Sequence, residues 1–96
     1  MALNELGVPP KAEADPAAFE IARVWVASGG QQVSLRHYQW SDPAAWGILL
    51  ADLTRHLANA YQDSGRDRVE TIRRIREGFD AEMDSPTDEP TGRIGA

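Results

Sequence analysis

The sequence predicts a two-layer α+β fold in which an antiparallel β-hairpin is followed by two helices, in the order β-β-α-α. Two observations predict it. β-Forming residues alternate with others on both sides of Gly29-Gly30, as in a tight hairpin. Two later segments, 42–63 and 67–84, then repeat apolar residues at helical spacing between start and stop signals.

Segments without an apolar period flank this region. Residues 1–15 and 85–96 are rich in proline, glycine and acids, a composition typical of mobile chain. We therefore expect one α+β domain over 16–84 between two flexible arms. Three apolar residues of the first arm could still dock in an assembly: Leu3, Leu6 and Val8.

The first strand is expected from Phe19 to Ala27. With Gly29 and Gly30 as the central turn residues, Val26 faces Val33, Val24 faces Leu35, and Phe19 faces Trp40. One face is then expected to form the core, with Ala22, Val24, Val26, Val33, Leu35 and His37. The other carries Phe19, Ile21, Arg23, Trp25, Ser34, Arg36, Tyr38 and Trp40.

The first long helix is expected to begin at Asp42-Pro43 and to end at about Asp63, before Ser64-Gly65. Asp42 is the expected N-cap, and Pro43 suits the first helical turn because it has no N–H to satisfy. Its apolar stripe can cover the hairpin: Trp46, Leu49, Leu50, Leu53, Leu57, Ala60 and Tyr61. Asp15-Pro16 repeats the start signal, but a period of two follows it, so at most one helical turn is expected there.

The second long helix is expected from Asp67 to about Asp84. Glu70, three residues after Asp67, predicts a capping box, and Ser85-Pro86 ends the helix. Its apolar seam consists of Val69, Ile72, Ile75, Phe79 and Met83.

The size of the domain predicts self-association. A lone two-stranded ribbon is marginally stable and has two open edges. The chain has no cysteine for disulfides and only two histidines for a metal. We therefore expect two copies to complete the sheet as a homodimer, with no cofactor and no metal.

Charge and composition favour protein partners. The formal net charge is −5, which disfavours nucleic acid and anionic membranes. The N-terminus lacks a basic start followed by an apolar run, and no segment approaches the roughly 20 apolar residues of a membrane span. A cytoplasmic protein is the default expectation.

The outer face of the hairpin has two interpretations. Arg23, Trp25, Arg36, Tyr38 and Trp40 resemble a stacking surface for single-stranded nucleic acid, and residues 21–40 contain no acid. Alternatively, these aromatic residues stack across strands, arginine planes rest on them, and protein covers the face. We favour the protein-covered interpretation.

Small residues form a strip on the reverse side of the first long helix. They are Gly47, Ala51, Thr54 and Ala58. Such a strip allows another helix to approach closely, although alanine is also a good helix former at exposed sites.

The second long helix has arginines in its first part and acids at its end, opposite to what the helix dipole favours. Three i,i+4 ion pairs are expected to offset part of this unfavourable interaction with the helix dipole: Glu70–Arg74, Arg73–Glu77 and Arg76–Asp80. An antiparallel second copy would also offset the order, and an anion site is a third possibility. Arg73 and Arg76 are therefore candidate interface or ligand residues. Arg76 falls within the apolar seam and is expected to extend to solvent or to pair with Asp80.

An enzyme is the weakest hypothesis. Asp52 precedes His56 by four residues and could orient its ring as an acid–base pair. The sequence has no cysteine nucleophile, glycine-rich phosphate loop or metal-spaced cluster. No catalytic residue is predicted.

The run "DPAAWGILLADLTRH", Asp42 to His56, and the later Pro86-Thr87-Asp88 resemble a family of small uncharacterised bacterial proteins, mainly alphaproteobacterial, that forms a domain of unknown function. The resemblance covers about residues 19–90 and implies no activity. The sequence thus favours a homodimeric accessory or protein-interaction module, ahead of a single-stranded nucleic-acid or anionic-ligand binder.

Overall fold

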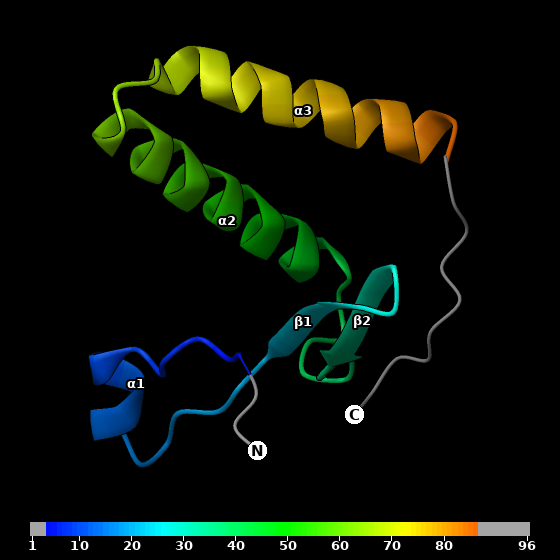
Figure 1. Ribbon diagram of the computed structural model, residues 1–96. Helices are drawn as coiled ribbons and strands as arrows, with labels where there is room; N and C mark the ends of the chain where they lie inside the picture. Colours follow the sequence, from blue (N-terminus) through cyan, green and yellow to red (C-terminus); the bar gives the residue numbers. More distant parts are fainter. Residues whose placement is uncertain (1–3, 87–96) are drawn as a thin grey trace. The chain divides into compact units, whose positions relative to one another are not determined.

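The computed structural model describes residues 4–86, which fall into two compact units. In the first unit, residues 4–39 form α1 (Pro10–Ala14), β1 (Ala22–Ala27) and β2 (Gly30–Leu35). In the second, residues 40–86 form α2 (Ala44–Asp63) and α3 (Arg68–Asp84) (Figure 1). The α+β class and the β-β-α-α order are confirmed. The five-residue α1 was not predicted, and the C-terminal arm lies outside the described residues from residue 87 on.

The hairpin turn lies one residue earlier than predicted. Ala27 pairs with Gly30 and Val24 with Val33, so the central turn residues are Ser28 and Gly29. Both have positive φ, 53° and 77°, as a tight turn that matches the twist of its strands requires. The predicted turn at Gly29-Gly30 and the pairing of Val24 with Leu35 are therefore wrong.

The two faces of the hairpin keep most of their predicted members. Moving the turn by one residue changes the pairing by two, and side chains alternate with a period of two, so Val24 and Val33 still share a face. The face predicted to form the core is not buried, because Val24 is 61% and Val26 is 84% exposed.

The hairpin is shorter than predicted at its open end. β1 begins at Ala22 rather than Phe19. A last ladder bond joins the Arg36 N–H to the Ile21 carbonyl at 2.9 Å, and the chain then turns as Gln39 N–H donates to the Arg36 carbonyl. The predicted pairing of Phe19 with Trp40 is therefore wrong.

The two Asp-Pro start signals form the same local turn with different continuations. The Asp42 carboxylate accepts the Ala44 N–H at 3.0 Å, and the Asp15 carboxylate accepts the Ala17 N–H at 2.9 Å. After Asp42 the chain continues as α2, whereas after Asp15 it makes a single turn. The single turn after Asp15 is confirmed, but the N-cap of α2 is Pro43, without a side-chain cap, so the prediction of Asp42 as the N-cap is wrong by one residue.

The ends of the helices are fixed by local backbone signals. At the end of α2, Gly65 has φ 93°, its N–H donates to the Gln62 carbonyl, and the Arg66 N–H donates to the Tyr61 carbonyl. These two bonds define a Schellman motif. The Arg66 guanidinium lies 5.6 Å from the centre of the Tyr61 ring, where an apolar contact often accompanies the motif.

The predicted capping box of α3 is only half formed. Asp67 is the N-cap and its carboxylate accepts the Glu70 N–H at 2.8 Å. The Glu70 carboxylate does not complete the box, because it binds Arg73 instead.

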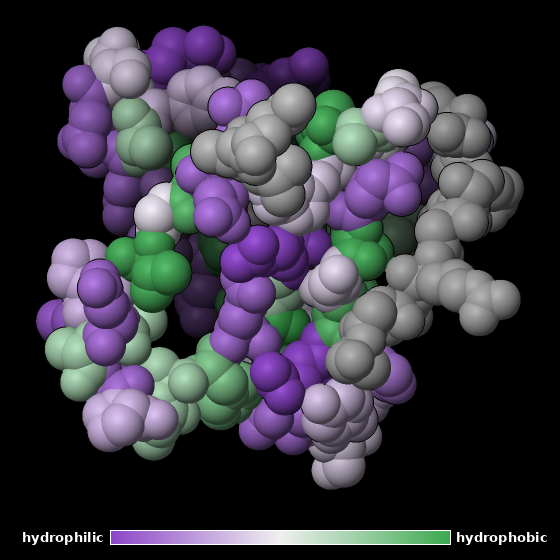
Figure 2. Space-filling model, turned by 60° about the horizontal axis from the view of Figure 1, so that its bottom comes forward, coloured by the Kyte–Doolittle hydropathy of each residue, from purple (hydrophilic) through white to green (hydrophobic). Residues whose placement is uncertain are grey.

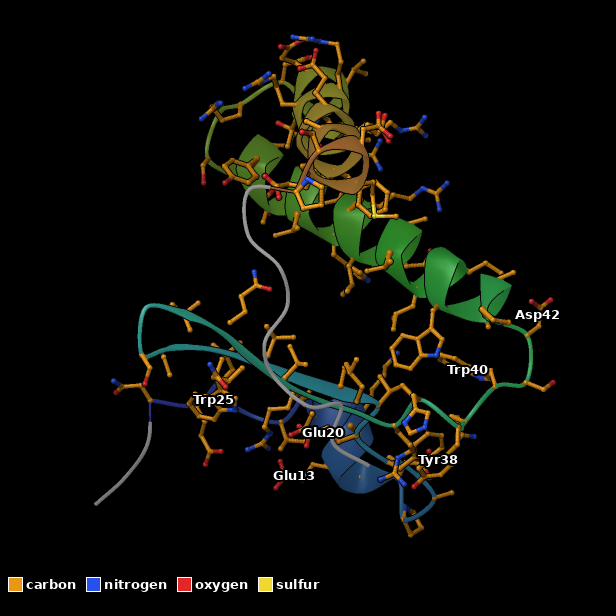
Figure 3. The ribbon with its side chains drawn as sticks, turned by 90° about the vertical axis from the view of Figure 1, so that its right-hand side faces the viewer. Glu13, Glu20, Trp25, Tyr38, Trp40 and Asp42 are labelled. Carbon is orange, nitrogen blue, oxygen red and sulfur yellow. The ribbon has the colours of Figure 1, made fainter. Side chains whose placement is uncertain are left out.

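The helices α2 and α3 form a hairpin whose arms spread apart away from the connecting loop (Figures 1 and 3). Near the loop, Ala58 is fully buried and Thr71 is 8% exposed, and the Arg68 Nε donates to Asn59 Oδ1 at 2.8 Å. Thr54 is half-buried, whereas Gly47 and Ala51 are exposed. The small-residue strip thus permits close packing only over its C-terminal half.

Candidate functional site

The predicted aromatic and arginine face does not form one surface. Trp25 and Tyr38 lie at opposite ends of the hairpin (Figure 3). Trp40 has left the hairpin altogether and makes an edge-to-face contact with Trp46 of α2, with ring centres 5.4 Å apart. The assignment of Trp40 to the hairpin face was therefore wrong, because the chain turns at residues 36–39 before reaching it.

One cluster surrounds Arg23 on β1. Its guanidinium contacts the carboxylate of Glu20 at 3.1 Å and that of Glu5 at 3.2 Å, and it lies 6.0 Å from the centre of the Trp25 ring. The hydrogen bond with Glu20, followed by the charges of Glu20 and Glu5, raises the pKa of Arg23 above its usual value. The pair with Glu5 ties the N-terminal segment to the outer face of β1.

A second cluster surrounds Arg36. Its guanidinium lies 5.3 Å from the centre of the Phe19 ring, its Nε donates to the Glu20 carbonyl at 3.1 Å, and its Nη1 donates to the Tyr38 hydroxyl at 3.1 Å. The ring of His37 meets Tyr38 edge-on at 5.7 Å. The Arg36 side chain thus joins the entry to β1 to the exit from β2.

Glu20 links these two clusters, and sequence reasoning missed it. Its carboxylate binds Arg23 and its carbonyl binds Arg36. The acid-free run of residues 21–40 begins one position after Glu20. The run alone therefore suggested a basic surface, although an acid directly before it pairs with one of its arginines. The i,i+3 spacing of Glu20 and Arg23 was a usable signal, but such spacing normally indicates a contact only on a helix.

A groove of about 640 Å³ separates the N-terminal segment from β1. Residues 4–9 and Ala12 form one wall, and residues 18–25 form the other. Glu5, Glu20 and Arg23 all line it, so its charged groups are already paired with each other. Its remaining walls are largely apolar, with Leu6, Val8 and Ile21 among them.

The proposed acid–base pair on α2 is not formed. The Asp52 carboxylate contacts the Arg55 guanidinium at 3.4 Å, so it does not orient His56. Across residues 4–86, no three histidine, aspartate or glutamate side chains gather in a way that could hold a metal ion. None of the helices in this described range is long and apolar enough to cross a membrane.

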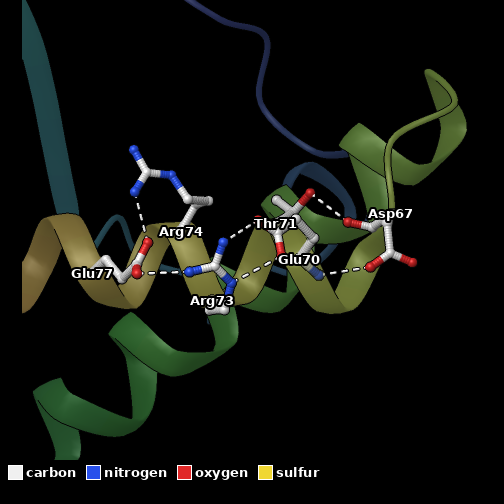
Figure 4. Close-up of polar contacts among 6 residues, drawn as sticks. All are labelled: Asp67, Glu70, Thr71, Arg73, Arg74 and Glu77. Atoms are coloured by element: carbon white, nitrogen blue, oxygen red, sulfur yellow. Dashed lines mark hydrogen bonds and ion pairs between the residues drawn. The ribbon is translucent and has the colours of Figure 1, made fainter.

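Several charged side chains of α3 form ion pairs with each other (Figure 4). Arg73 binds Glu70 and also Glu77, the latter at 2.7 Å, and Arg74 binds Glu77 at 2.7 Å. The hydrogen bond from Arg73 lowers the pKa of Glu70, and the charges of Arg73 and Arg74 lower it further. In turn, the hydrogen bond with Glu70 raises the pKa of Arg73. The predicted Arg73–Glu77 pair is confirmed, whereas Glu70 pairs with Arg73 rather than with Arg74.

The predicted pair of Arg76 with Asp80 does not form. Within the described chain, neither side chain makes a hydrogen bond or an ion pair. Arg76 is exposed and sits in the apolar seam of α3. The local pairs therefore account for Arg73 and Arg74 but leave Arg76 and Asp80 without a partner in this part of the chain.

These features define a small α+β domain made of a two-stranded hairpin and a helix pair. Its charges are paired on the hairpin and in part along α3, where Arg76 and Asp80 have no partner in the described chain. A family described as a domain of unknown function (DUF5076) matches residues 5–87, and the chain belongs to this family. The family match confirms the resemblance predicted from Asp42–His56. It also includes Glu5, the partner of Arg23.

A solved structure is similar over nearly the whole chain. It comes from the photosynthetic bacterium Rhodopseudomonas palustrus CGA009 and is named a candidate pyruvate dehydrogenase. The two sequences are 33% identical, the TM-score is 0.75, and the match covers 99% of this chain and 98% of that one. This likeness confirms the fold. No protein among the curated proteins matches the chain.

Proposed function

We propose that this domain is a non-enzymatic accessory module that self-associates and acts through contacts with protein. The observation that carries the proposal is the exposure of large apolar side chains in both units. Val24 and Val26 of the hairpin are exposed, as are Val69, Phe79 and Met83 of α3. Figure 2 shows apolar side chains reaching the surface at several places among hydrophilic ones. Exposed apolar surface of this kind commonly marks protein interaction sites.

The architecture of the hairpin supports the same proposal. Its sheet has two strands within the described residues, and both edges of such a ribbon offer unpaired backbone groups. Because Ile21 shares a ladder bond with Arg36, the alternation of an antiparallel pair turns the N–H and C=O groups of Ala22, Val24 and Val26 away from β2. A partner strand could pair with these groups and complete the sheet.

Binding of single-stranded nucleic acid or an anionic ligand through Arg23 and Arg36 stays a prediction with less support. Both guanidinium groups already bind groups of their own chain, and a phosphate would have to displace these contacts. The dehydrogenase name of the Rhodopseudomonas structure gains no support from α2, where Asp52 binds Arg55 instead of orienting a histidine.

Analytical ultracentrifugation of the purified full chain tests the proposal. We expect the sedimentation coefficient to rise with concentration across the micromolar range, from monomer to dimer. A monomer at every concentration would reject self-association. A titration of the tryptophan fluorescence with single-stranded RNA at low salt serves as a counter-test, and saturable quenching would favour the nucleic-acid hypothesis instead.

A further inference from the structure

The exposed side of α3 carries a strict heptad pattern. Val69, Arg76 and Met83 recur every seven residues, and Ile72 and Phe79 follow the first two by three. These are the a and d positions of a coiled-coil seam. The exposed fractions are 73% for Val69, 52% for Phe79 and 68% for Met83.

The a positions of this seam lie away from the contact between α3 and α2. At 100° per residue, Thr71 and Ile75 point about 100° or more away from Arg76 around the helix axis. Thr71 is buried and Ile75 is half-buried. Ile72 lies between the two sides and is half-buried. The packing with α2 therefore leaves the a positions of the seam uncovered.

The charges of α3 indicate what covers the seam. Its first part carries arginines and its last part carries acids, among them Arg73, Arg76, Asp80 and Asp84. A parallel copy would place like charges together. An antiparallel copy would place each arginine end against an acidic end, so charge complementarity favours the antiparallel orientation.

We propose that two copies of the chain associate through their α3 helices, antiparallel and related by a two-fold axis. The inference rests on the self-association proposed above and assigns it to α3 rather than to the open edge of the hairpin. In an antiparallel pair an a position of one helix packs opposite a d position of the other. Arg76 then lies against Phe79 of the second copy, and Ile72 lies against its Met83.

This alignment gives partners to Arg76 and Asp80, which have none within the described chain. Asp80 follows Phe79 directly, so it approaches Arg76 of the second copy. The guanidinium stacks on the Phe79 ring and pairs with the Asp80 carboxylate. The two-fold axis repeats the contact, so the interface contains two such pairs. The two-fold axis also makes the macrodipoles of the two side-by-side helices antiparallel, so that the positive end of each lies beside the negative end of the other, which favours the arrangement.

Charge reversal at these two positions tests the proposal. In the Arg76→Glu variant the new carboxylate meets Asp80 across the axis, and in the Asp80→Arg variant the new guanidinium meets Arg76. We expect each variant to raise the dimer Kd about tenfold or more, because like charges placed across an interface oppose association. An equimolar mixture of the two variants should form a heterodimer, in which one cross-axis contact keeps Arg76 with Asp80 and the other joins the two introduced groups.

The heterodimer should have near wild-type affinity, since both of its cross-axis contacts are between opposite charges. The matched control is Arg74→Glu, which makes the same charge change about 160° around the helix from Arg76. Its dimer Kd should stay within about threefold of the wild-type value, because an exposed charge far from the interface contributes little. Circular dichroism verifies that each variant keeps its helices, and rescue in the mixture shows that both variants fold.

The outcomes separate this inference from the proposed function. A monomeric wild type rejects self-association itself. A dimeric wild type whose Kd is unchanged by both reversals overturns the α3 interface and leaves self-association standing. Two weakened variants that fail to rescue each other overturn the antiparallel pairing. A loss of unfolding stability without a change in Kd would mean that another segment of the same chain covers the seam, which also overturns the proposal.

Discussion

The helix pair and the hairpin were equally visible in the sequence, but only the helix pair was predicted with correct boundaries. Both α2 and α3 begin and end within two residues of their expected positions. The hairpin has the expected strands, yet its turn and pairing are displaced. The difference shows that a helix end is decided by its own few residues, whereas a strand pairing is decided by a competition between turns.

That competition is visible at Ser28-Gly29-Gly30. Gly29-Gly30 was the expected turn because glycine adopts positive φ at no steric cost. The structure places Ser28 at φ 53° instead, a conformation that is uncommon for a residue with a side chain. The chosen turn brings Val24 opposite Val33 and lets Arg36 continue the ladder to Ile21. Cross-strand contacts of this kind can outweigh the preference of one turn residue.

Disrupting the helix pair should have the largest effect on stability. Ala58 is fully buried at the close approach of α2 and α3, so the larger side chain of an Ala58→Leu variant must displace the neighbouring helix. We expect the free energy of unfolding to fall by about 1 to 3 kcal/mol, as for overpacked cores. Urea unfolding followed by far-ultraviolet circular dichroism measures it.

The control for this variant is Ala51→Leu, the same change in the exposed half of the small-residue strip. It should alter the free energy of unfolding by less than about 0.5 kcal/mol, as is usual for surface positions. Equal losses in the two variants would contradict the diverging arrangement of the helices.

A pair of alanine substitutions distinguishes the observed turn from the predicted one. Gly29 has φ 77°, so Gly29→Ala should destabilise the hairpin by about 1 to 2 kcal/mol. Gly30 begins β2 without a positive φ, and an added Cβ would meet nothing within 4 Å. Gly30→Ala should therefore be nearly neutral. Under the predicted register both changes would be costly.

Amide hydrogen exchange of Trp25 and Ala27 is the appropriate measurement, because both residues belong to pairs that exchange bonds with β2. We expect exchange to accelerate in Gly29→Ala only. Comparable acceleration in Gly30→Ala would restore Gly29-Gly30 as the turn.

The fold could be predicted to the level of its elements because each long element carries its own signals. Asp67 and Gly65 fixed the loop between the helices, and alternation fixed the faces of the hairpin. The helix α1 was missed because a five-residue segment that begins at a proline is too short to show a helical period.

The candidate site was less predictable because its partners come from outside the alternating pattern of the hairpin. Arg23 and Arg36 were expected to lie on the rings of Trp25, Tyr38 and Trp40. Arg23 does lie near Trp25, whereas Arg36 lies on Phe19 instead. Their polar partners are Glu5, at the N-terminal segment, and Glu20, just before β1. A carboxylate 18 positions away from Arg23 has no periodic signal in the sequence. On α3, by contrast, the spacing alone predicted that Arg73 and Glu77 would pair.

The smallest expected effect concerns the pH dependence of α3. The Arg73 guanidinium lowers the pKa of Glu70 in the folded protein. The folded state therefore binds the proton less readily than the unfolded state does. The pair contributes stability at pH values above the unfolded carboxyl's pKa, and that contribution is lost as the pH falls through the lower, folded value. Because Glu70 is exposed, solvent keeps the contribution small.

Replacing Glu70 by glutamine should remove this share of the acid sensitivity. Thermal unfolding from neutral pH down to about one unit below the usual glutamate pKa should give a Tm that falls less in Glu70→Gln than in the wild type. The control Glu13→Gln removes a carboxylate from α1 of the hairpin unit and should leave the wild-type slope intact. If the fall of Tm with pH were reduced equally in both variants, the acid sensitivity would come from the net charge of the protein. The ion pair of Glu70 with Arg73 would then stabilise the protein no more than an unpaired carboxylate elsewhere on its surface.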